Sequence, residues 1–438
     1  MYNRSTYYVE DSKTFRKQLL LWGAQFEVSC YLDNNGYSDY FTGSDFEVKF
    51  AAGVTSELVS SEKKNAFDHL QEYTDITNAW LFGFLTYELK DQTENLTSGN
   101  ADHILLPQIY FFQPNIIITV EIHHKIIIEV GDDIPYTADH IFNSILGFYE
   151  EDEPEPEHRE IPVLSRVSRE EYMHQVRKIK KHIARGDIYE MNYCMEFFAT
   201  ANINPYREFL KLMDISPTPY SAFFRYRDKY LICASPERFL KKKDSVIISQ
   251  PIKGTYPRGS TTEEDEQLKY RLKQDLKERS ENIMIVDLVR NDLSRIADRK
   301  SVKVEELCGI YTFPQVHQMI STISAKVNNR CIAEILKHTF PMGSMTGAPK
   351  IEAMKLIEKY ENTRRGLYSG AVGYITPEKG FDFNVVIRSI IYNAGIHYLS
   401  FMVGSAITSF SDPAKEYEEC LLKASAIQKI LNKQPQHA

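Results

Sequence analysis

The chain has 438 residues, enough for two ordinary domains or for one large unit with an extensive core. Hydrophobic residues make up 43% and charged residues 26%, which are ordinary values for a globular protein and exclude a disordered or fibrous chain. The net charge of −8 offers no basic surface for nucleic acid or an anionic membrane. The first residues lack the apolar core of a signal peptide, and no apolar run approaches the ~20 residues that span a bilayer. We therefore expect a cytoplasmic protein.

An acidic, proline-spaced run divides the chain. Residues 150–160, EEDEPEPEHRE, cannot bury themselves and predict an exposed connection. They separate a strand-rich part, 1–149, from a larger part, 161–438. In the first part, NAWLFGFLTYEL and NIIITVEIHHKIIIEV predict strands, and the second segment is expected to turn near His123 and His124.

Beyond the acidic run, strand-like and helical segments alternate irregularly. The strand-like runs cover 221–234, 245–252, 370–376, 383–392 and 396–403. The helical runs cover 169–185, 263–298, 332–340, 350–360 and 412–431. Long helices beside several antiparallel strands predict an α+β protein, a large two-sheet antiparallel β sandwich flanked by helices. No Rossmann glycine fingerprint, P-loop or G-x-S-x-G elbow is present.

Two of the predicted helices carry paired glutamates on one face. Glu278 and Glu281 are three residues apart, and Glu416 and Glu419 repeat this spacing, with Lys423 four residues further on. Such pairs are found on solvated surfaces, but apolar residues adjoin both of these. If the two faces converge, their carboxylates are natural ligands for Mg²⁺.

Two further segments have features that are suited to binding an anion. FPMGSMTGAPK predicts a loop that opens a helix, and its free N–H groups suit a carboxylate or phosphate, although a simple helix cap explains it equally well. Arg388 lies within the apolar run NVVIRSIIY, so it needs an acidic partner or an anionic ligand.

Several motifs, in their order and spacing, resemble the chorismate-utilising family over roughly residues 165–430. They are SPERF, PIKGTYPRG, ENIMIVDLVRNDLSRI, GSMTGAPK, RGLYSGAVGY, VIRS and EYEECLLKA. The family includes anthranilate synthase component I, aminodeoxychorismate synthase component I, and the isochorismate and salicylate synthases.

The resemblance implies a role for each matching position. Glu281 and Glu419, supported by Glu278 and Glu416, correspond to the carboxylates that hold Mg²⁺. Ser344 corresponds to the loop beside the ring carboxylate of chorismate. Tyr368, Arg388 and the backbone of Gly404 correspond to contacts with the enolpyruvyl carboxylate. Lys423 corresponds to the basic residue that closes the site. Glu237 matches the general acid/base, and His317 matches the active-site histidine.

Lys253 in PIKGT distinguishes the branches of this family. The anthranilate branch typically has alanine there, whereas aminodeoxychorismate synthases have lysine. A neutral amine at this position would add to C2 of chorismate, displace the C4 hydroxyl, and leave when ammonia adds at C4. Because the ordinary lysine pKa is about 10.4, the site must depress the pKa of Lys253, and Mg²⁺ and Arg258 are candidate positive neighbours. The water-activating lysine of the isochorismate branch is replaced by Glu190.

The resemblance thus favours aminodeoxychorismate formation from chorismate and ammonia, for 4-aminobenzoate and folate synthesis. Anthranilate synthesis and a non-catalytic relative remain the alternatives. None of the six cysteines lies in the Gly-x-Cys-x-Gly elbow of a class I glutaminase, so ammonia from glutamine would require a separate glutaminase subunit. The N-terminal part departs from the family, since CYLDNNG has Asn34 where tryptophan-binding relatives have serine.

Overall fold

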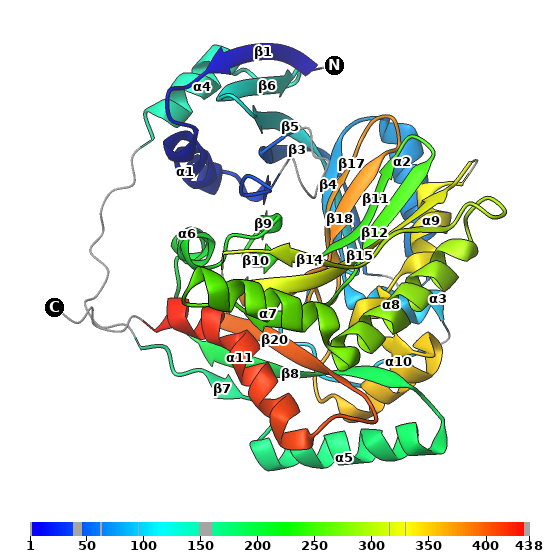
Figure 1. The fold of residues 1–438 in the computed structure, drawn as a ribbon. Helices are drawn as coiled ribbons and strands as arrows, with labels where there is room; N and C mark the ends of the chain where they lie inside the picture. Colours follow the sequence, from blue (N-terminus) through cyan, green and yellow to red (C-terminus); the bar gives the residue numbers. More distant parts are fainter. Residues whose placement is uncertain are drawn as a thin grey trace.

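The computed structural model describes residues 2–37, 46–61, 64–94, 96–148, 160–314, 316–328 and 330–432 (Figure 1). Except for Glu160, the predicted acidic connection at 150–160 lies outside these residues. Within the described part of the chain, no helix is long and apolar enough to cross a membrane.

The strands form one hydrogen-bonded antiparallel network. One half runs, in spatial order, through β8 (Glu190–Thr200), β20 (Tyr398–Ile407), β19 (Ser389–Asn393), β10 (Lys229–Ser235), β9 (Tyr220–Tyr226), β2 (Val28–Asp33) and β3 (Val48–Ser60). β5 (Ile109–Glu121) pairs with β3 and leads into the other half, which runs through β4 (Leu81–Leu85), β17 (Ala371–Ile375), β18 (Phe381–Asn384), β11 (Arg238–Lys243), β12 (Val246–Gln250) and β15 (Val316–Lys326). β13 (Ile252–Pro257) and β14 (Lys303–Thr312) both pair with β15.

The two halves face each other across a shared core. The rings of Phe84 on β4 and Phe224 on β9 are 5.4 Å apart, although three strands separate β4 from β9 in the network. Tyr110 on β5 and Tyr226 on β9 are 4.4 Å apart. The predicted α+β class and antiparallel sandwich are therefore confirmed, with the layers formed by one bent network.

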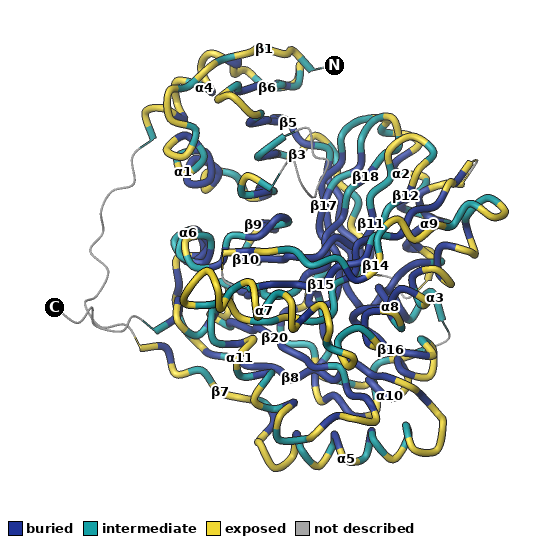
Figure 2. Tube along the Cα trace, viewed as in Figure 1, coloured by how far each residue is buried: buried dark blue, intermediate teal, exposed yellow. Residues whose placement is uncertain are grey.

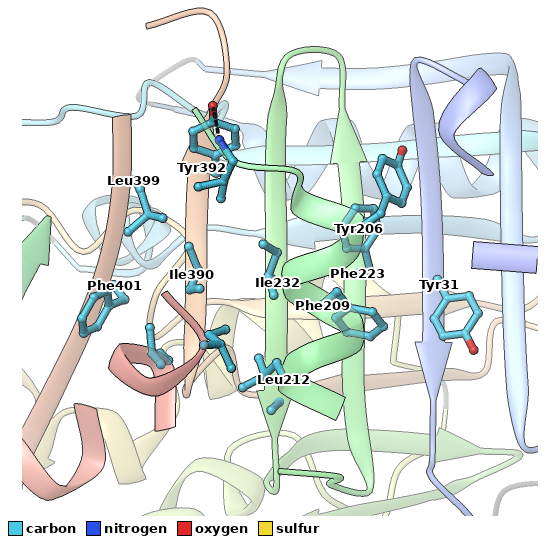
Figure 3. Packing of buried hydrophobic residues seen from close by; sticks show 14 of the residues in the cluster. Tyr31, Tyr206, Phe209, Leu212, Phe223, Ile232, Ile390, Tyr392, Leu399 and Phe401 are labelled. Carbon is cyan, nitrogen blue, oxygen red and sulfur yellow. Dashed lines mark hydrogen bonds between the residues drawn. The ribbon is translucent and has the colours of Figure 1, made fainter. Parts of the chain in front are cut away.

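Helices cover the outer faces of this sandwich. α1 (Ser12–Trp22), α5 (Arg169–Arg185), α6 (Pro205–Ile215) and α11 (Pro413–Leu431) bury apolar side chains against the half that contains β8 and β20. Figure 3 shows Phe209 and Leu212 of α6 beside Phe223 and Ile232 of the sheet. The strands are mostly buried, whereas α5 is exposed along its outer side (Figure 2).

The other half is covered by a second group of helices. α8 (Leu276–Ser294) and α9 (Ile332–Thr339) pack their apolar residues into the same core as α2 (Ala66–Thr77). α7 (Thr262–Gln274) precedes α8, and α10 (Lys350–Tyr360) follows the Gly/Ser/Thr loop.

Most predicted boundaries after residue 160 are close to those observed. The helix expected over 263–298 is two helices, because Asp275 leaves the helical conformation and caps α8 by accepting from the amides of Lys277 and Glu278. The strand expected over 221–234 is a hairpin that turns at Arg227, which has φ 58°. The hairpin predicted near His123 and His124 is confirmed as β5 and β6 (Lys125–Gly131). Helices α1, α2, α4 (Ala138–Leu146) and α6 were not predicted.

Candidate active site

Lys253 lies in an irregular stretch of β13. The register of β13 against β15 shifts between Ile252 and Thr255, and Gly254 adopts φ 90°, a conformation that disfavours side chains. A Cβ on Gly254 would also lie 3.2 Å from Glu278. The shift brings the Lys253 ammonium to 3.0 Å from the carboxylate of the buried Glu190 on β8. Lys253 therefore occupies a bulge that points its charge between the two halves of the sandwich.

Carboxylates control the protonation of Lys253. Burial disfavours its charged form, but Glu190, Glu281 and Glu237 outweigh burial and hold the pKa of Lys253 above its ordinary value. The sequence predicted the opposite direction, with Arg258 as one positive neighbour. That prediction is wrong for the chain alone: Arg258 donates two hydrogen bonds to Asp265 of α7, at 2.7 and 2.9 Å, so its charge is already paired.

Glu237 and Ser344 form a buried pair at the end of β10. The Ser344 hydroxyl donates to a Glu237 carboxyl oxygen at 2.5 Å. Burial raises the pKa of Glu237 to about 7, although Ser344, Lys253 and Arg388 favour its ionised form. Near neutrality this carboxyl can therefore hold or release a proton.

Arg388 has no ion-pair partner within 4.0 Å among the residues that the structure describes. Burial holds the pKa of its guanidinium below the usual value, and Glu237 only partly compensates. A guanidinium in this state favours an anionic ligand.

The four glutamates of the two pairs lie around one lysine, Lys277, so the convergence that the sequence left open is present in the structure. The Lys277 ammonium lies 3.9 Å from Glu278, 3.7 Å from Glu281 and 4.0 Å from Glu416. Burial opposes ionisation of Lys277, but these carboxylates and Glu419 outweigh it and raise its pKa. The carboxylates of α8 and α11 thus share one region of surplus negative charge.

This carboxylate cluster, Glu278, Glu281, Glu416 and Glu419, is suited to a cation. One carboxyl oxygen of Glu281 is buried without a hydrogen-bond partner, and burial raises the pKa of Glu281 to about 7. In the described part of the chain, however, no three His, Cys, Asp or Glu side chains are already grouped as a metal site. The donors therefore have the chemistry for a hard cation, and the Lys277 ammonium lies among them.

Lys423 lies on α11 and Gly404 on β20, and Tyr368 lies shortly before β17. Lys423 pairs with Glu419 at 2.7 Å and donates to the carbonyl oxygen of Gly404 at 2.9 Å. Burial opposes ionisation of Glu419, but Lys423 outweighs it and holds the pKa of Glu419 below its usual range. A Cβ on Gly404 would lie 2.5 Å from the Cys194 sulfur, which itself is 3.9 Å from the Tyr368 hydroxyl. Close packing thus requires glycine at 404.

His317 is turned away from this group. Its Nδ1 lies 2.9 Å from the Thr312 hydroxyl and its Nε2 lies 2.9 Å from Asp265 of α7. Both ring nitrogens are engaged, so neither is free for a substrate. The proposed catalytic role of His317 is not supported, because strand alternation directs its side chain towards α7.

Gln318, the next residue, was missed. Alternation places it on the opposite face of β15 from His317. Its side chain is 1% exposed and its amide oxygen has no hydrogen-bond partner. Burying an amide oxygen without a hydrogen-bond partner is energetically unfavourable. This feature of Gln318 can be recognised only in the tertiary structure.

Arg365 was also missed, and it fixes the Ser344 loop. It is buried, pairs with Glu361 at 2.6 Å, and donates to the carbonyl oxygens of Met345 and Asn192. The loop before α10 is therefore attached to β8 by this guanidinium as well as by backbone pairing of Gly347 and Ala348 with Met191 and Glu190.

Comparison with known proteins shows the family of this chain. The family model described as "chorismate binding enzyme" matches residues 7–429. The chain belongs to this family. It is 33% identical over 359 residues to aminodeoxychorismate synthase component 1 of Bacillus subtilis, covering 80% of this chain and 76% of that protein. It is 30% identical over 382 residues to anthranilate synthase component 1 of Acetivibrio thermocellus, covering 81% and 75%.

Other relatives match over a shorter stretch of the chain. The chain is 37% identical over 270 residues to the component 1 protein of Escherichia coli, covering 61% of this chain and 59% of that protein. Among solved structures, anthranilate synthase component I of Streptococcus pneumoniae is similar, with a TM-score of 0.76, 24% identity, and coverage of 88% and 93%. The isochorismate synthase MenF of Escherichia coli has a TM-score of 0.77 with 16% identity, covering 98% and 94%. These two likenesses show the fold alone.

The raised pKa of Glu237 predicts a stability effect with a definite sign. An unfolded glutamate titrates near 4.5, whereas folded Glu237 titrates near 7, so folding loses stability as pH rises between these values. Glu237→Gln should therefore unfold with a free energy higher by up to about 3 kcal/mol at pH 8, and by less than about 1 kcal/mol at pH 5. Urea unfolding at both pH values in metal-free buffer measures this difference. The exposed Glu352→Gln is the control, and an equal gain for Glu237→Gln at both pH values would contradict the assignment.

Proposed function

We propose that this chorismate-binding enzyme acts as aminodeoxychorismate synthase component I. It would replace the C4 hydroxyl of chorismate by ammonia and give 4-amino-4-deoxychorismate, a precursor of 4-aminobenzoate and folate. The observation that carries this proposal is Lys253, whose side chain is 12% exposed and whose ammonium lies 3.0 Å from Glu190 and near Glu237. Several relatives named aminodeoxychorismate synthase, at 33–41% identity, support it.

Lys253 is suited to act as the nucleophile. Because its carboxylate neighbours hold its pKa above the ordinary value, Lys253 would first have to give up a proton, and Glu190, with a second carboxyl oxygen that is buried without a hydrogen-bond partner, is the nearest acceptor. The freed amine would add to C2 of chorismate as the C4 hydroxyl leaves. Glu237, protonated near neutrality, would donate the proton that releases this hydroxyl as water. Ammonia would then add at C4, lose a proton, and expel the Lys253 amine.

The remaining residues would bind and orient the dianionic substrate. Arg388, without a carboxylate partner in the described chain, would pair with the enolpyruvyl carboxylate, together with Tyr368 and the amide of Gly404. Lys423 would close this side, and Ser344 would lie beside the ring carboxylate while orienting Glu237. His317 would not contact the substrate.

Glu281 and Glu419, supported by Glu278 and Glu416, would hold Mg²⁺, which when bound would offset their charge and stabilise the ring carboxylate of chorismate. The Glu281 oxygen that has no hydrogen-bond partner, 3.7 Å from the Lys277 ammonium, supports this. Lys277 would have to move away from the cluster for a cation to enter.

Anthranilate synthesis is the second candidate. A relative with that name matches 81% of this chain at 30% identity. The two reactions share chorismate and ammonia, and they differ in whether nitrogen is added at C4 or at C2. Lys253 favours addition at C4, because its amine would occupy C2 during the reaction.

A glutaminase partner would supply the ammonia. The names "component 1" of the bacterial relatives indicate that those proteins have a second component. We propose a separate class I glutaminase subunit for this chain as well. The chain alone should use ammonium salts and release no glutamate from glutamine.

Product analysis tests the proposed function. The purified chain is expected to consume chorismate in the presence of Mg²⁺ and an ammonium salt, and its product should become 4-aminobenzoate only after aminodeoxychorismate lyase is added. Anthranilate fluorescence without the lyase would favour the second candidate. Chorismate that stays unconsumed under all these conditions would make the chain a non-catalytic member of the family.

Lys253→Ala tests the nucleophile. It should lose most aminodeoxychorismate formation and gain some anthranilate, because ammonia can then reach C2 directly. A chorismate-like electrophile should label the parent chain at residue 253, as mass spectrometry can show, and spare the variant. The exposed Lys303→Ala is the matched control. Equal turnover by Lys253→Ala and the parent would refute covalent catalysis.

Glu281→Gln and Glu419→Gln test the cation site. Each removes one charge from the carboxylate cluster, so affinity for Mg²⁺ should fall by at least about tenfold with little loss of stability. Isothermal titration with Mg²⁺ alone measures this without turnover. Glu418→Gln on the same helix is the control, since Glu418 pairs with Arg169 at the surface. Unchanged affinity in both cluster variants would mean that the cation binds elsewhere.

A further inference from the structure

Lys350 is the first residue of α10 and follows the loop that carries Ser344. A cation in the first turn of a helix is disfavoured, because the amino end of the helix dipole is positive. Lys350 is nevertheless largely buried, since its side chain is only 15% exposed. A charge in this position needs specific partners that offset both the dipole and the burial.

The ammonium of Lys350 makes three hydrogen bonds. It donates to the Asp292 carboxylate at 2.5 Å and to the carbonyl oxygens of Thr339 and Pro341 at 3.2 and 2.9 Å. Asp292 lies on α8 and is buried. Burial raises the pKa of Asp292 above its usual value, whereas Lys350 and Arg295 favour its ionised form. The lysine therefore ties the start of the loop, Thr339 and Pro341, to α8.

The same face of α8 contacts the middle of the loop. Leu288 and Asp292 are four residues apart, so they lie one turn apart on one side of the helix. A Cβ on Gly343 would lie only 3.2 Å from Leu288, so the loop approaches α8 closely one residue before Ser344. On the other side, Arg365 donates to the carbonyl oxygen of the residue after Ser344. Ser344 is thus held between two anchored neighbours.

Ser344 connects this loop to Glu237. Its hydroxyl donates to the Glu237 carboxyl at 2.5 Å, and both residues are buried. Glu237 and Asp292 also line one small cavity of about 20 Å³, together with Thr339 and Ser344. Asp292, the partner of Lys350, therefore borders the same space as Glu237.

The other charged groups near Glu237 come from different elements. Lys253 lies on β13 and Arg388 lies just before β19, and both favour the ionised form of Glu237. Arg238, which also lines the small cavity, is paired with Asp382 at 2.9 Å.

Loosening the loop would change the protonation of Glu237 in a definite direction. The Ser344 hydroxyl favours the ionised form by donating to it, so losing that bond would raise the pKa of Glu237 further above its ordinary value. An Asp292 carboxylate without its lysine would act in the same direction across the small cavity. A clean test must therefore remove both charges of the pair together.

We propose that Lys350, through its pair with Asp292, is a positioning residue for Glu237. It fixes the loop at 339–345, the loop places the Ser344 hydroxyl, and this hydroxyl orients the carboxyl that would protonate the leaving hydroxyl of chorismate. The inference rests on the proposed function and adds a residue that would contact neither chorismate nor the carboxylate cluster. Because the pair acts through Ser344, its effect must disappear where residue 344 has no hydroxyl.

A mutant cycle tests the proposal. Lys350→Met and Asp292→Asn are made together, and this neutral pair leaves no unpaired charge in the buried region. Ser344→Ala and the neutral pair should each lower kcat with chorismate and ammonium salt about tenfold. The combined variant should lose little more than Ser344→Ala alone, whereas independent effects would multiply to about a hundredfold. Lys355→Met on the same helix is the control and should keep parent turnover, since Lys355 pairs with Glu352 at the surface.

The pH profile of kcat distinguishes positioning from a loss of folded protein. Less folded chain lowers kcat equally at every pH, whereas loss of the Ser344 hydrogen bond moves the apparent pKa near 7 upward. We expect an upward shift of about half a pH unit or more, equal in Ser344→Ala and in the neutral pair.

Urea unfolding in metal-free buffer gives the same test without turnover. The stability gain of Glu237→Gln grows with pH from about 4.5, the value for an unfolded glutamate, and levels off at the pKa of the folded chain. The pH at which this gain levels off should be higher in the neutral-pair background than in the parent.

A parent chain that does not turn over chorismate would overturn the proposed function, and the unfolding measurement would still decide whether the pair positions Glu237. Losses that multiply in the cycle would overturn the positioning role. So would a neutral pair that leaves both the pH profile and the levelling pH unmoved. If the neutral pair does not fold, Asp292→Asn alone enters the same measurements, because Lys350 then keeps its two carbonyl contacts, and the same outcomes decide.

Discussion

Excess negative charge in a largely buried space is the constraint on which the site depends. Glu190, Glu237 and Glu281 surround Lys253, and the carboxylate cluster surrounds Lys277. Burying these groups is unfavourable unless each finds an opposite charge or keeps its proton. Glu237 and Glu281 therefore titrate near 7, whereas Lys253 and Lys277 hold their protons more firmly than usual. Binding of a divalent cation would change the pKa values of all these groups together.

The bent sheet is what brings these charges together. Lys253 comes from one half of the network and Glu190 from the other, so their contact exists only when the halves face each other. The two glutamate pairs come from α8 and α11, which cover different halves. Arg365 stabilises the junction by attaching the loop before α10 to β8. A change in how the halves pack would thus alter protonation and positioning at once.

Continuity of the inner face also explains why the site has two sides. Residues at every second position of β8 and β20 connect the Lys253 region to a cavity of about 270 Å³ that Tyr368 lines. The side near Lys277 carries the carboxylate cluster, and the cavity side carries both carboxyl and guanidinium groups.

Local pattern was sufficient for much of the fold. The helices at 169–185 and 350–360 were predicted at their observed ends, because their apolar spacing, and for α5 also the Ser168 cap, act within one segment. The break at Asp275 and the turn at Arg227 were missed, since helical or strand-like residues continue on both sides of each. The local sequence pattern could not predict strand register or side-chain direction either. One position along β15 separates His317, which is bonded to α7, from Gln318, which is buried and unsatisfied.

The sequence by itself determined the α+β class, the family, and the residue types available for chemistry, because these depend on composition, periodicity and motif spacing. Tertiary structure alone decided that the glutamate pairs converge, that Lys253 meets Glu190, and that its charge is held by carboxylates. The reason is physical: pKa and contact depend on distances between groups that lie far apart along the chain, and those distances exist only after the two halves of the sheet have packed together.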